Sequence, residues 1–325
     1  AIDRLSIVDN RTGLFPIHRS MRIVAMTGTS GASTDAFVID DGAISGPATT
    51  RASRGKGRPE RSSPPPVTTN ARIVTRALLR LLGAAEAIPD IRHDKDLHVL
   101  AVLAAAPALG GDEWQLRFGR ELNATEDAAS LRRRPGTERI AVVDGKHVSA
   151  FAVRQADDGR WIAASDAHER LAHQPWRRWR LAYRDVSSPT NTRSLIAALL
   201  PPGCVSTHTL FCLRTPTSLR RQLYLCGMLN SLVADWFVRR FLGSHVTTRL
   251  IASVRVPSAH WSNPTCRVVA RLTLRLMRDP ADEEAQARLH RAAADLYGLS
   301  TDDLAHIADD FPRLSPLVRA GMLRA

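Results

Sequence analysis

The sequence has few cysteines, and they are scattered. Cys204, Cys212, Cys226 and Cys266 never form a Cys-x-x-Cys pair, and no histidine pair at ligand spacing lies beside them. The pattern therefore does not indicate a zinc site. It is typical of buried, reduced thiols in a cytoplasmic protein rather than of a disulfide framework.

Long apolar runs are also missing. The longest, from about residue 98 to residue 111, is interrupted by Pro107 and is shorter than the roughly 20 residues that cross a bilayer. Asp3, Arg4 and Asp9 stand where a secretory signal would carry its apolar core. We therefore expect a cytoplasmic protein without a membrane partner. The first residue, Ala1, is compatible with removal of an initiator Met and equally with a piece of a longer chain.

Motifs for methyl transfer, phosphate binding and serine hydrolysis are absent. No Phe-x-Gly-x-Gly turn is present to bind S-adenosylmethionine, and no Asn-Pro-Pro-Tyr string is present to hold a flipped adenine. The nearest string, Asn263-Pro264-Thr265-Cys266, is interpreted as a turn before a helix. Neither a Gly-x-x-x-x-Gly-Lys-Ser/Thr loop nor a Gly-x-Ser-x-Gly elbow occurs. We therefore assign no catalytic residue, metal ligand or cofactor to this chain.

One weak nuclease pattern is present. Asp144 and Lys146 form an Asp-x-Lys string, and Pro89-Asp90 supplies the Pro-Asp that precedes it in metal-dependent nucleases. The two halves are widely separated, and Asp144 begins an Asp-Gly-Lys turn. A metal-dependent nuclease or restriction enzyme fragment using Asp90, Asp144 and Lys146 remains an alternative hypothesis.

What the chain has in excess is arginine. Lysine and arginine total 45 against 32 aspartates and glutamates, which gives a formal net charge of +13, and only Lys56, Lys95 and Lys146 are lysines. This excess favours a polyanionic partner such as DNA, RNA or an anionic surface. It also matches the composition of proteins from GC-rich genomes, so a basic structural protein is a second alternative.

Hydrophobic patterning predicts an α+β fold. The 325 residues, 44% of them hydrophobic, can bury one large core or two modest ones. We predict a mixed, twisted sheet from the β-rich middle of the chain, with helices on its flanks and a helical bundle at the C-terminus. The predicted strands are residues 21–26, 36–39, 139–143, 148–153, 179–183, 195–200 and 207–213. The predicted helices are residues 71–82, 94–106, 219–241, 266–277, 281–297 and 301–308.

A series of short strings then occurs in one order along most of the chain. They are residues 13–20, 87–90, 118–127, 143–147, 180–188, 191–193, 201–203, 207–209, 229–234 and 245–247. In content and order they resemble the C-terminal half of large adenine-specific DNA methyltransferases with a TaqI-like specificity domain, from type II restriction-modification systems.

The resemblance implies a division of labour. A catalytic domain, absent from this chain, would bind S-adenosylmethionine and the flipped adenine, while this half would recognise double-stranded DNA. We expect residues 1–41 to be a β segment continuing from the missing catalytic domain, and residues 42–70 to be a flexible linker or loop. Residues 71–260 would form the TaqI-like target-recognition domain, and residues 261–325 a helical C-terminal region. The chain is then a fragment or a stand-alone specificity subunit with a methyltransferase partner.

Three polar segments are candidates for DNA contact. DNA recognition needs hydrogen-bonding side chains for base edges beside basic groups for phosphates. Each segment follows a predicted strand or helix and is rich in such residues. The segment with Lys146 can alternatively be a simple hairpin, and the segment from Arg184 to Arg193 a solvated turn. The candidates are Lys146 and His147; Arg184, Ser187, Ser188, Asn191, Thr192 and Arg193; and His245, Thr247 and Arg249.

Overall fold

The computed structural model describes residues 1–10, 13, 15–17, 19, 22–41, 71–83, 87–131, 138–154, 159–187 and 191–324. The predicted linker, residues 42–70, lies outside them. The chain divides into two compact units, Ala1–Leu81 with Ile91–Leu97 and Leu82–Asp90 with His98–Ala325. The fold is α+β, as predicted.

The first unit is built on a four-stranded sheet in the order β2-β1-β3-β4. Its strands are β1 (Ile2–Asp9), β2 (Arg22–Gly28), β3 (Ala36–Asp41) and β4 (Arg72–Thr75). Strand β1 pairs antiparallel with β2 and parallel with β3. Leu5, Phe37, Ile39 and Val74 are buried along one face of the sheet. The helix predicted over residues 71–82 was wrong in its first part, because the β-branched residues of β4 pair with β3 before α1 (Arg76–Leu82) begins.

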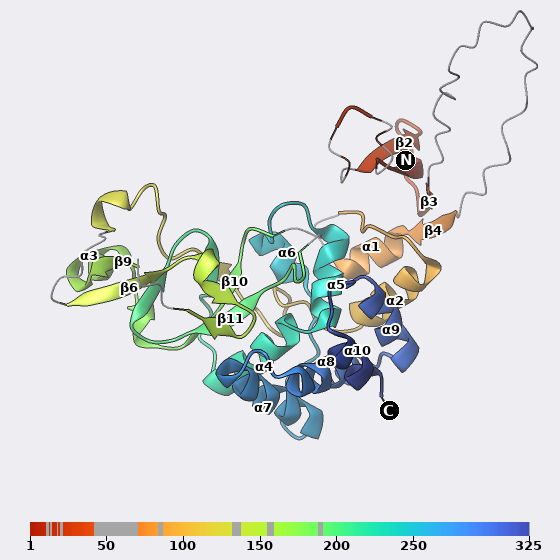
Figure 1. Ribbon diagram of the computed structural model, residues 1–325. Helices are drawn as coiled ribbons and strands as arrows, with labels where there is room; N and C mark the ends of the chain where they lie inside the picture. Colours follow the sequence, from red (N-terminus) through yellow and green to blue (C-terminus); the bar gives the residue numbers. More distant parts are fainter. Residues whose placement is uncertain are drawn as a thin grey trace, which may run out of the picture. The chain divides into compact units, whose positions relative to one another are not determined.

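Small sheets in the second unit replace the single sheet expected from the sequence. Four strands follow the order β11-β10-β13-β5, three follow β12-β6-β9, and β7 pairs with β8. In Figure 1, β6 and β9 lie beside α3. The strands are β5 (Phe118–Gly119), β6 (Arg139–Val143), β7 (Val148–Ser149), β8 (Ala152–Val153), β9 (Arg160–Ala163), β10 (Arg180–Arg184), β11 (Ala197–Leu200), β12 (Cys204–Ser206) and β13 (Leu210–Leu213).

Strand β6 packs against the antiparallel sheet with one face and against α3 with the other. Ala141 and Val143 pack with Ala182, Leu210 and Cys212 of the antiparallel sheet. The intervening residues of β6 pack instead with a second cluster around α3, because successive side chains on a strand point to opposite faces. All four cysteines are buried and free, as their scattered spacing suggested.

Helices cover the antiparallel sheet. Helix α4 contacts β10 and β11 and packs on α7, which in turn contacts α8 (Figure 1). The helices are α2 (Asp94–Ala104), α3 (Ala164–Arg170), α4 (Leu219–Leu229), α5 (Leu232–Phe241), α6 (Thr248–Ser253), α7 (Pro264–Arg278), α8 (Glu283–Tyr297), α9 (Thr301–Asp309) and α10 (Pro316–Leu323). Within the described part of the chain, none of them has the length and apolarity needed for a membrane span.

The single helix predicted over residues 219–241 is two helices. Ser231 is the N-cap of α5 and accepts a hydrogen bond from the Ala234 amide, while its hydroxyl donates to the Met228 carbonyl at 2.6 Å. Asn230 donates to the carbonyl of Ala197 in β11 at 2.8 Å and accepts from the Ala197 amide at 3.1 Å. The break therefore satisfies the backbone of a neighbouring strand.

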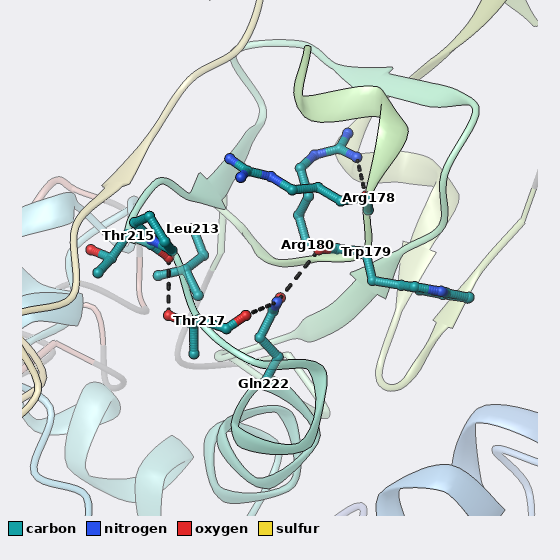
Figure 2. Close-up of a pocket in the computed structure, with 8 residues that line it drawn as sticks. Arg178, Trp179, Arg180, Leu213, Thr215, Thr217 and Gln222 are labelled. Atoms are coloured by element: carbon teal, nitrogen blue, oxygen red, sulfur yellow. Dashed lines mark hydrogen bonds between the residues drawn. The ribbon is translucent and has the colours of Figure 1, made fainter. Parts of the chain in front are cut away.

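Helix α4 is fixed to β10 through Gln222. Its side chain accepts from the Leu181 amide at 2.7 Å and donates to the Thr217 carbonyl at 2.9 Å. Figure 2 shows the bond from Gln222 to Thr217 beside a pocket of about 210 Å³ that is lined also by Arg178, Trp179 and Leu213. Because Gln222 is fully engaged with the backbone, this junction holds the sheet and α4 in a fixed relation.

Candidate nucleic-acid interface

The turn that carries Lys146 is held in place by a second turn, residues 207–209. The Gly145 amide donates to the Thr209 hydroxyl at 2.8 Å, and the Thr207 hydroxyl donates to Asp144 at 2.6 Å. A Cβ at Gly145 would lie 3.1 Å from the Thr209 carbonyl oxygen, so glycine permits this close approach. Lys146 is exposed at the tip of the turn.

Asp144 has a structural environment. Arg160 donates to both of its carboxylate oxygens at 2.7 and 2.6 Å. Partial burial alone raises the pKa of Asp144, but the hydrogen bonds from Thr207 and Arg160 hold it below its usual value. His147 accepts from the Asp144 amide through Nδ1 at 3.0 Å and so caps the same turn. Among the described residues, no three histidine, cysteine or acidic side chains form a possible metal site.

The second and third candidate segments pair with each other. Asp185, Val186 and Ser187 follow β10, and the bridge between Val186 and His245 is antiparallel. The Val246 amide donates to the Asp185 carbonyl at 2.8 Å, and the Ser187 amide donates to the Ser244 carbonyl at 3.1 Å. Segments about 60 residues apart in sequence thus lie side by side.

Thr209 joins the first candidate segment to this pair. Its hydroxyl accepts from Gly145, and its carbonyl accepts from the Asp185 amide at 3.1 Å. Residues next to Lys146 and next to Arg184 therefore contact the same threonine. The structure brings all three segments to the same end of the antiparallel sheet, where β10 ends and β13 begins.

Arg120 lies at the same end of the sheet, and the sequence interpretation did not select it. Its guanidinium lies 5.1 Å from the centre of the Phe211 ring and 3.8 Å from Asp185. The same Asp185 oxygen lies 3.3 Å from Nδ1 of His245. Arg120 and His245 are both about half exposed, while Asp185 is 9% exposed. Only the pairing of β10, β13 and β5 reveals this cluster, because no spacing in the sequence predicts it.

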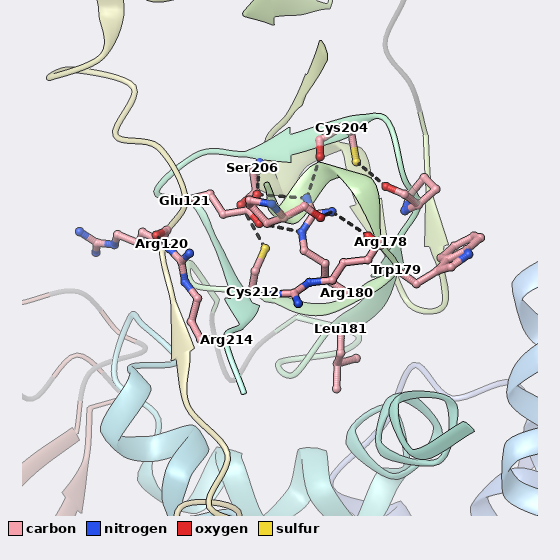
Figure 3. Close-up of polar contacts among 12 residues, drawn as sticks. Arg120, Glu121, Arg178, Trp179, Arg180, Leu181, Cys204, Ser206, Cys212 and Arg214 are labelled. Atoms are coloured by element: carbon pink, nitrogen blue, oxygen red, sulfur yellow. Dashed lines mark hydrogen bonds and ion pairs between the residues drawn. The ribbon is translucent and has the colours of Figure 1, made fainter. Parts of the chain in front are cut away.

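Arg214 extends the basic surface beyond Arg120. Its guanidinium donates to the Arg120 carbonyl oxygen and crosses Gly119, where a Cβ would lie 3.0 Å from Nε of Arg214. Figure 3 shows Arg120 and Arg214 beside each other, whereas Glu121 turns the opposite way toward Arg180. Gly119 therefore leaves the space that lets Arg214 lie along the strand edge.

A buried ion pair lies next to the exposed basic residues. Arg180 donates to Glu121 at 2.6 Å from Nε and at 3.1 Å from Nη2, and both side chains are nearly inaccessible (Figure 3). Burial alone lowers the pKa of Arg180, but Glu121 raises it above its usual value. Arg180 also donates to the Cys204 carbonyl, and Glu121 accepts from the Ser206 amide. The pair thus joins β10 to β12 with its hydrogen-bonding groups satisfied.

The remaining candidates fall into exposed and buried groups. Asn191, Thr192 and Arg249 are exposed, and Arg184 is half-buried at the end of β10. Thr247 caps α6 by accepting from the Leu250 amide at 3.1 Å. Ser187 is buried and donates to the Ser194 carbonyl at 2.5 Å, so its hydroxyl already has an intramolecular partner.

Arg193 also turns into the protein. Nη1 donates to the Asn230 carbonyl at 3.2 Å, and Nη2 lies 2.8 Å from Nε2 of His290 in α8. Ser188 lies outside the described residues.

The comparisons with known proteins give a similarity in structure but no match in sequence. No protein-family model matches the chain, and no curated protein matches it in sequence. The fold is similar to the structure of the type IIL restriction-modification enzyme MmeI in complex with DNA, with a TM-score of 0.39 and 11% identity. The match covers 61% of this chain and 35% of that one, so this chain spans about a third of the enzyme's length.

Proposed function

We propose that this chain binds double-stranded DNA in a sequence-specific manner and is the target-recognition part of an adenine-specific DNA methyltransferase of a restriction-modification system. The observation that carries the proposal is the convergence of three polar segments at one end of the antiparallel sheet through Thr209. The polar loops at the end of a sheet can approach a groove, while nearby basic side chains contact phosphates.

The candidate residues suit two kinds of DNA contact, one to phosphates and one to base edges. Lys146, Arg120, Arg214 and Arg249 carry positive charge on exposed side chains and suit phosphate contacts. Arg184 is half-buried at the end of a paired strand, and its side chain has no hydrogen bond to another described residue. A guanidinium in such a position suits bidentate hydrogen bonds to guanine.

The methyltransferase part of the proposal depends on the resemblance in sequence to TaqI-like specificity domains. S-adenosylmethionine and the flipped adenine would be bound by a catalytic domain or partner subunit, since this chain lacks both motifs. The role of this chain is then to place the target base pair in register with that partner.

The nuclease alternative has less support. Both oxygens of Asp144 accept hydrogen bonds from Arg160, and one accepts also from Thr207, so the carboxylate is engaged in holding the turn. A metal ligand at this position would have to give up these bonds. DNA cleavage that requires magnesium, abolished by Asp144→Asn, would revive the alternative.

A direct test is duplex binding as a function of salt, measured by fluorescence anisotropy. Phosphate contacts release counterions, so with roughly 6–10 contacts the affinity should fall about a thousandfold or more between 50 and 200 mM salt. Lys146→Ala should weaken binding to all sequences about equally and reduce the salt slope by roughly one unit. Arg313→Ala, an exposed arginine in the connection between α9 and α10, is the matched control and should leave the slope unchanged. A flat salt profile for the wild type would refute DNA binding.

A further inference from the structure

Helix α5 binds the backbone of the loop that carries Asn191 and Thr192. Nη2 of Arg239 donates to the Asn191 carbonyl at 2.8 Å and to the Thr192 carbonyl at 3.1 Å. Nη1 of the same guanidinium donates to the Asp310 carbonyl at 2.9 Å. One side chain thus fixes two consecutive peptide groups of the loop.

A buried carboxylate holds the next part of the loop. Asp235 accepts from the amides of Ser194 and Leu195, each at 3.1 Å, and lies 3.4 Å from Nε of Arg239. Burial raises the pKa of Asp235, although Arg239, Arg193 and the two amides oppose this rise. Asp235 is completely buried, so its bonds to the loop backbone are shielded from water.

The side chain of Arg193 makes a third set of contacts that holds the loop. Its bonds to the Asn230 carbonyl and to His290 tie the loop to the α4–α5 break and to α8. Burial, together with the charge of Arg193, lowers the pKa of His290 well below 6.5, so the imidazole is neutral and can accept the guanidinium N–H. A guanidinium held in this way is not presented to a groove.

The side chains that remain presented are those of Asn191 and Thr192. Both are exposed, and neither side chain has a hydrogen bond to another described residue. The Ser187 to Ser194 hydrogen bond places the loop next to the paired segments of the interface. The backbone of residues 191–195 is therefore preorganised, while the side chains of Asn191 and Thr192 are exposed and can contact a ligand.

We infer that Asn191 determines specificity by reading an adenine, and that Arg193, Asp235 and Arg239 are positioning residues. The inference deepens the proposed function and rests on it. A side-chain amide offers one acceptor and one donor in the geometry that matches N6 and N7 of adenine in the major groove. A carboxylate offers only acceptors and instead suits the N4 amino group of cytosine.

The test is binding-site selection from random duplex DNA at one fixed salt concentration. The wild type should select adenine at one position that Asn191→Ala makes degenerate, with a loss of roughly 5- to 150-fold on the cognate site. Asn191→Asp should move the preference at that position toward cytosine. Because Asn191 is exposed, both variants should keep the wild-type thermal unfolding midpoint.

We expect a different result in the same selection for variants of the positioning residues. Arg239→Ala and Arg193→Lys should weaken discrimination at the Asn191 position more than elsewhere, without changing the preferred base. If Arg193→Lys changes preference at another position and spares that of Asn191, Arg193 is a reader and the inference fails. Unchanged selection by both Asn191 variants also overturns it, with the DNA-binding proposal intact. Absence of any preference in the wild type refutes the sequence-specific function itself.

Discussion

Arg120 and Glu121 are neighbours in sequence, but they belong to two different regions of the molecule. Glu121 faces inward to Arg180, and the side chains of that pair are 1% and 2% exposed. Arg120 faces outward beside Asp185 and His245, where its side chain is 51% exposed. The inner region has its hydrogen bonds satisfied within the protein, and the outer region leaves basic groups accessible.

The comparison shows that an arginine's partner, rather than its presence, indicates its role. In a chain whose net charge is +13, most arginines give no functional signal by themselves. Arg180, Arg193 and Arg239 bind carboxylates or carbonyl groups inside the fold and hold strands and loops in place. Arg120, Arg214 and Lys146 instead have exposed side chains.

Glu121→Ala should have the largest effect on stability. Removing one partner of a buried pair leaves the Arg180 charge uncompensated, at a cost of roughly 3–5 kcal/mol. Urea denaturation should show this loss as a lower midpoint. A double change, Glu121→Leu with Arg180→Met, removes both charges and should restore much of the lost stability. A cost below about 1 kcal/mol for Glu121→Ala would mean that the inner region is not built on this pair.

His290→Gln tests whether His290, which contacts Arg193, is buried and neutral in the folded protein. The pKa of His290 is lowered in the folded protein, so the unfolded chain binds protons more tightly, and stability falls as the pH drops below about 6.5. The wild type should lose up to about 1.4 kcal/mol per pH unit from this group as the pH falls from 6.5 toward 5.5. Denaturation of the variant over the same range should show a shallower dependence, and identical slopes would place His290 in contact with solvent.

Arg170→Ala samples a pair of intermediate exposure. Nη1 of Arg170 donates to Asp127 at 2.8 Å, and the side chains are 38% and 16% exposed. Solvent screens this pair, so the change should cost less than about 1 kcal/mol of unfolding free energy. A cost equal to that of Glu121→Ala would show that burial does not separate the two regions.

Arg120→Ala should have the smallest effect on stability and a measurable effect on DNA binding. The exposed guanidinium contributes little to folding, so the denaturation midpoint should stay close to that of the wild type. If Arg120 contacts a phosphate, the slope of log affinity against log salt should fall by roughly one unit. A lower midpoint with an unchanged salt slope would assign Arg120 to the framework.

Much of the fold followed from the sequence. Periodicity located most of the helices and the strands of the β-rich middle, because amphipathic spacing reports which side chains face the core. It did not locate the break at Asn230, since the apolar residues continue on both sides of it. The reason for the break is the backbone of Ala197, a long-range partner that no local pattern reveals.

The candidate site was predictable in part. Polar loops after strands drew attention to the three segments, and the structure places them together. Their sorting into exposed and internally bonded side chains was not predictable. Arg193 is internal because His290, 97 residues further along the chain, lies within hydrogen-bonding distance of it. Ser187 is buried for a comparable reason, through its bond to the Ser194 carbonyl.

Thr209 sets a limit on how this surface can be altered. Since it holds the Gly145 and Asp185 amides at once, a residue inserted in the 207–209 turn shifts two loops together. Exchange of single exposed side chains, by contrast, leaves every loop length and every backbone contact as it is. If the proposed function holds, the DNA target should therefore be changed more readily by point substitution at positions such as 191 than by transplanting whole loops.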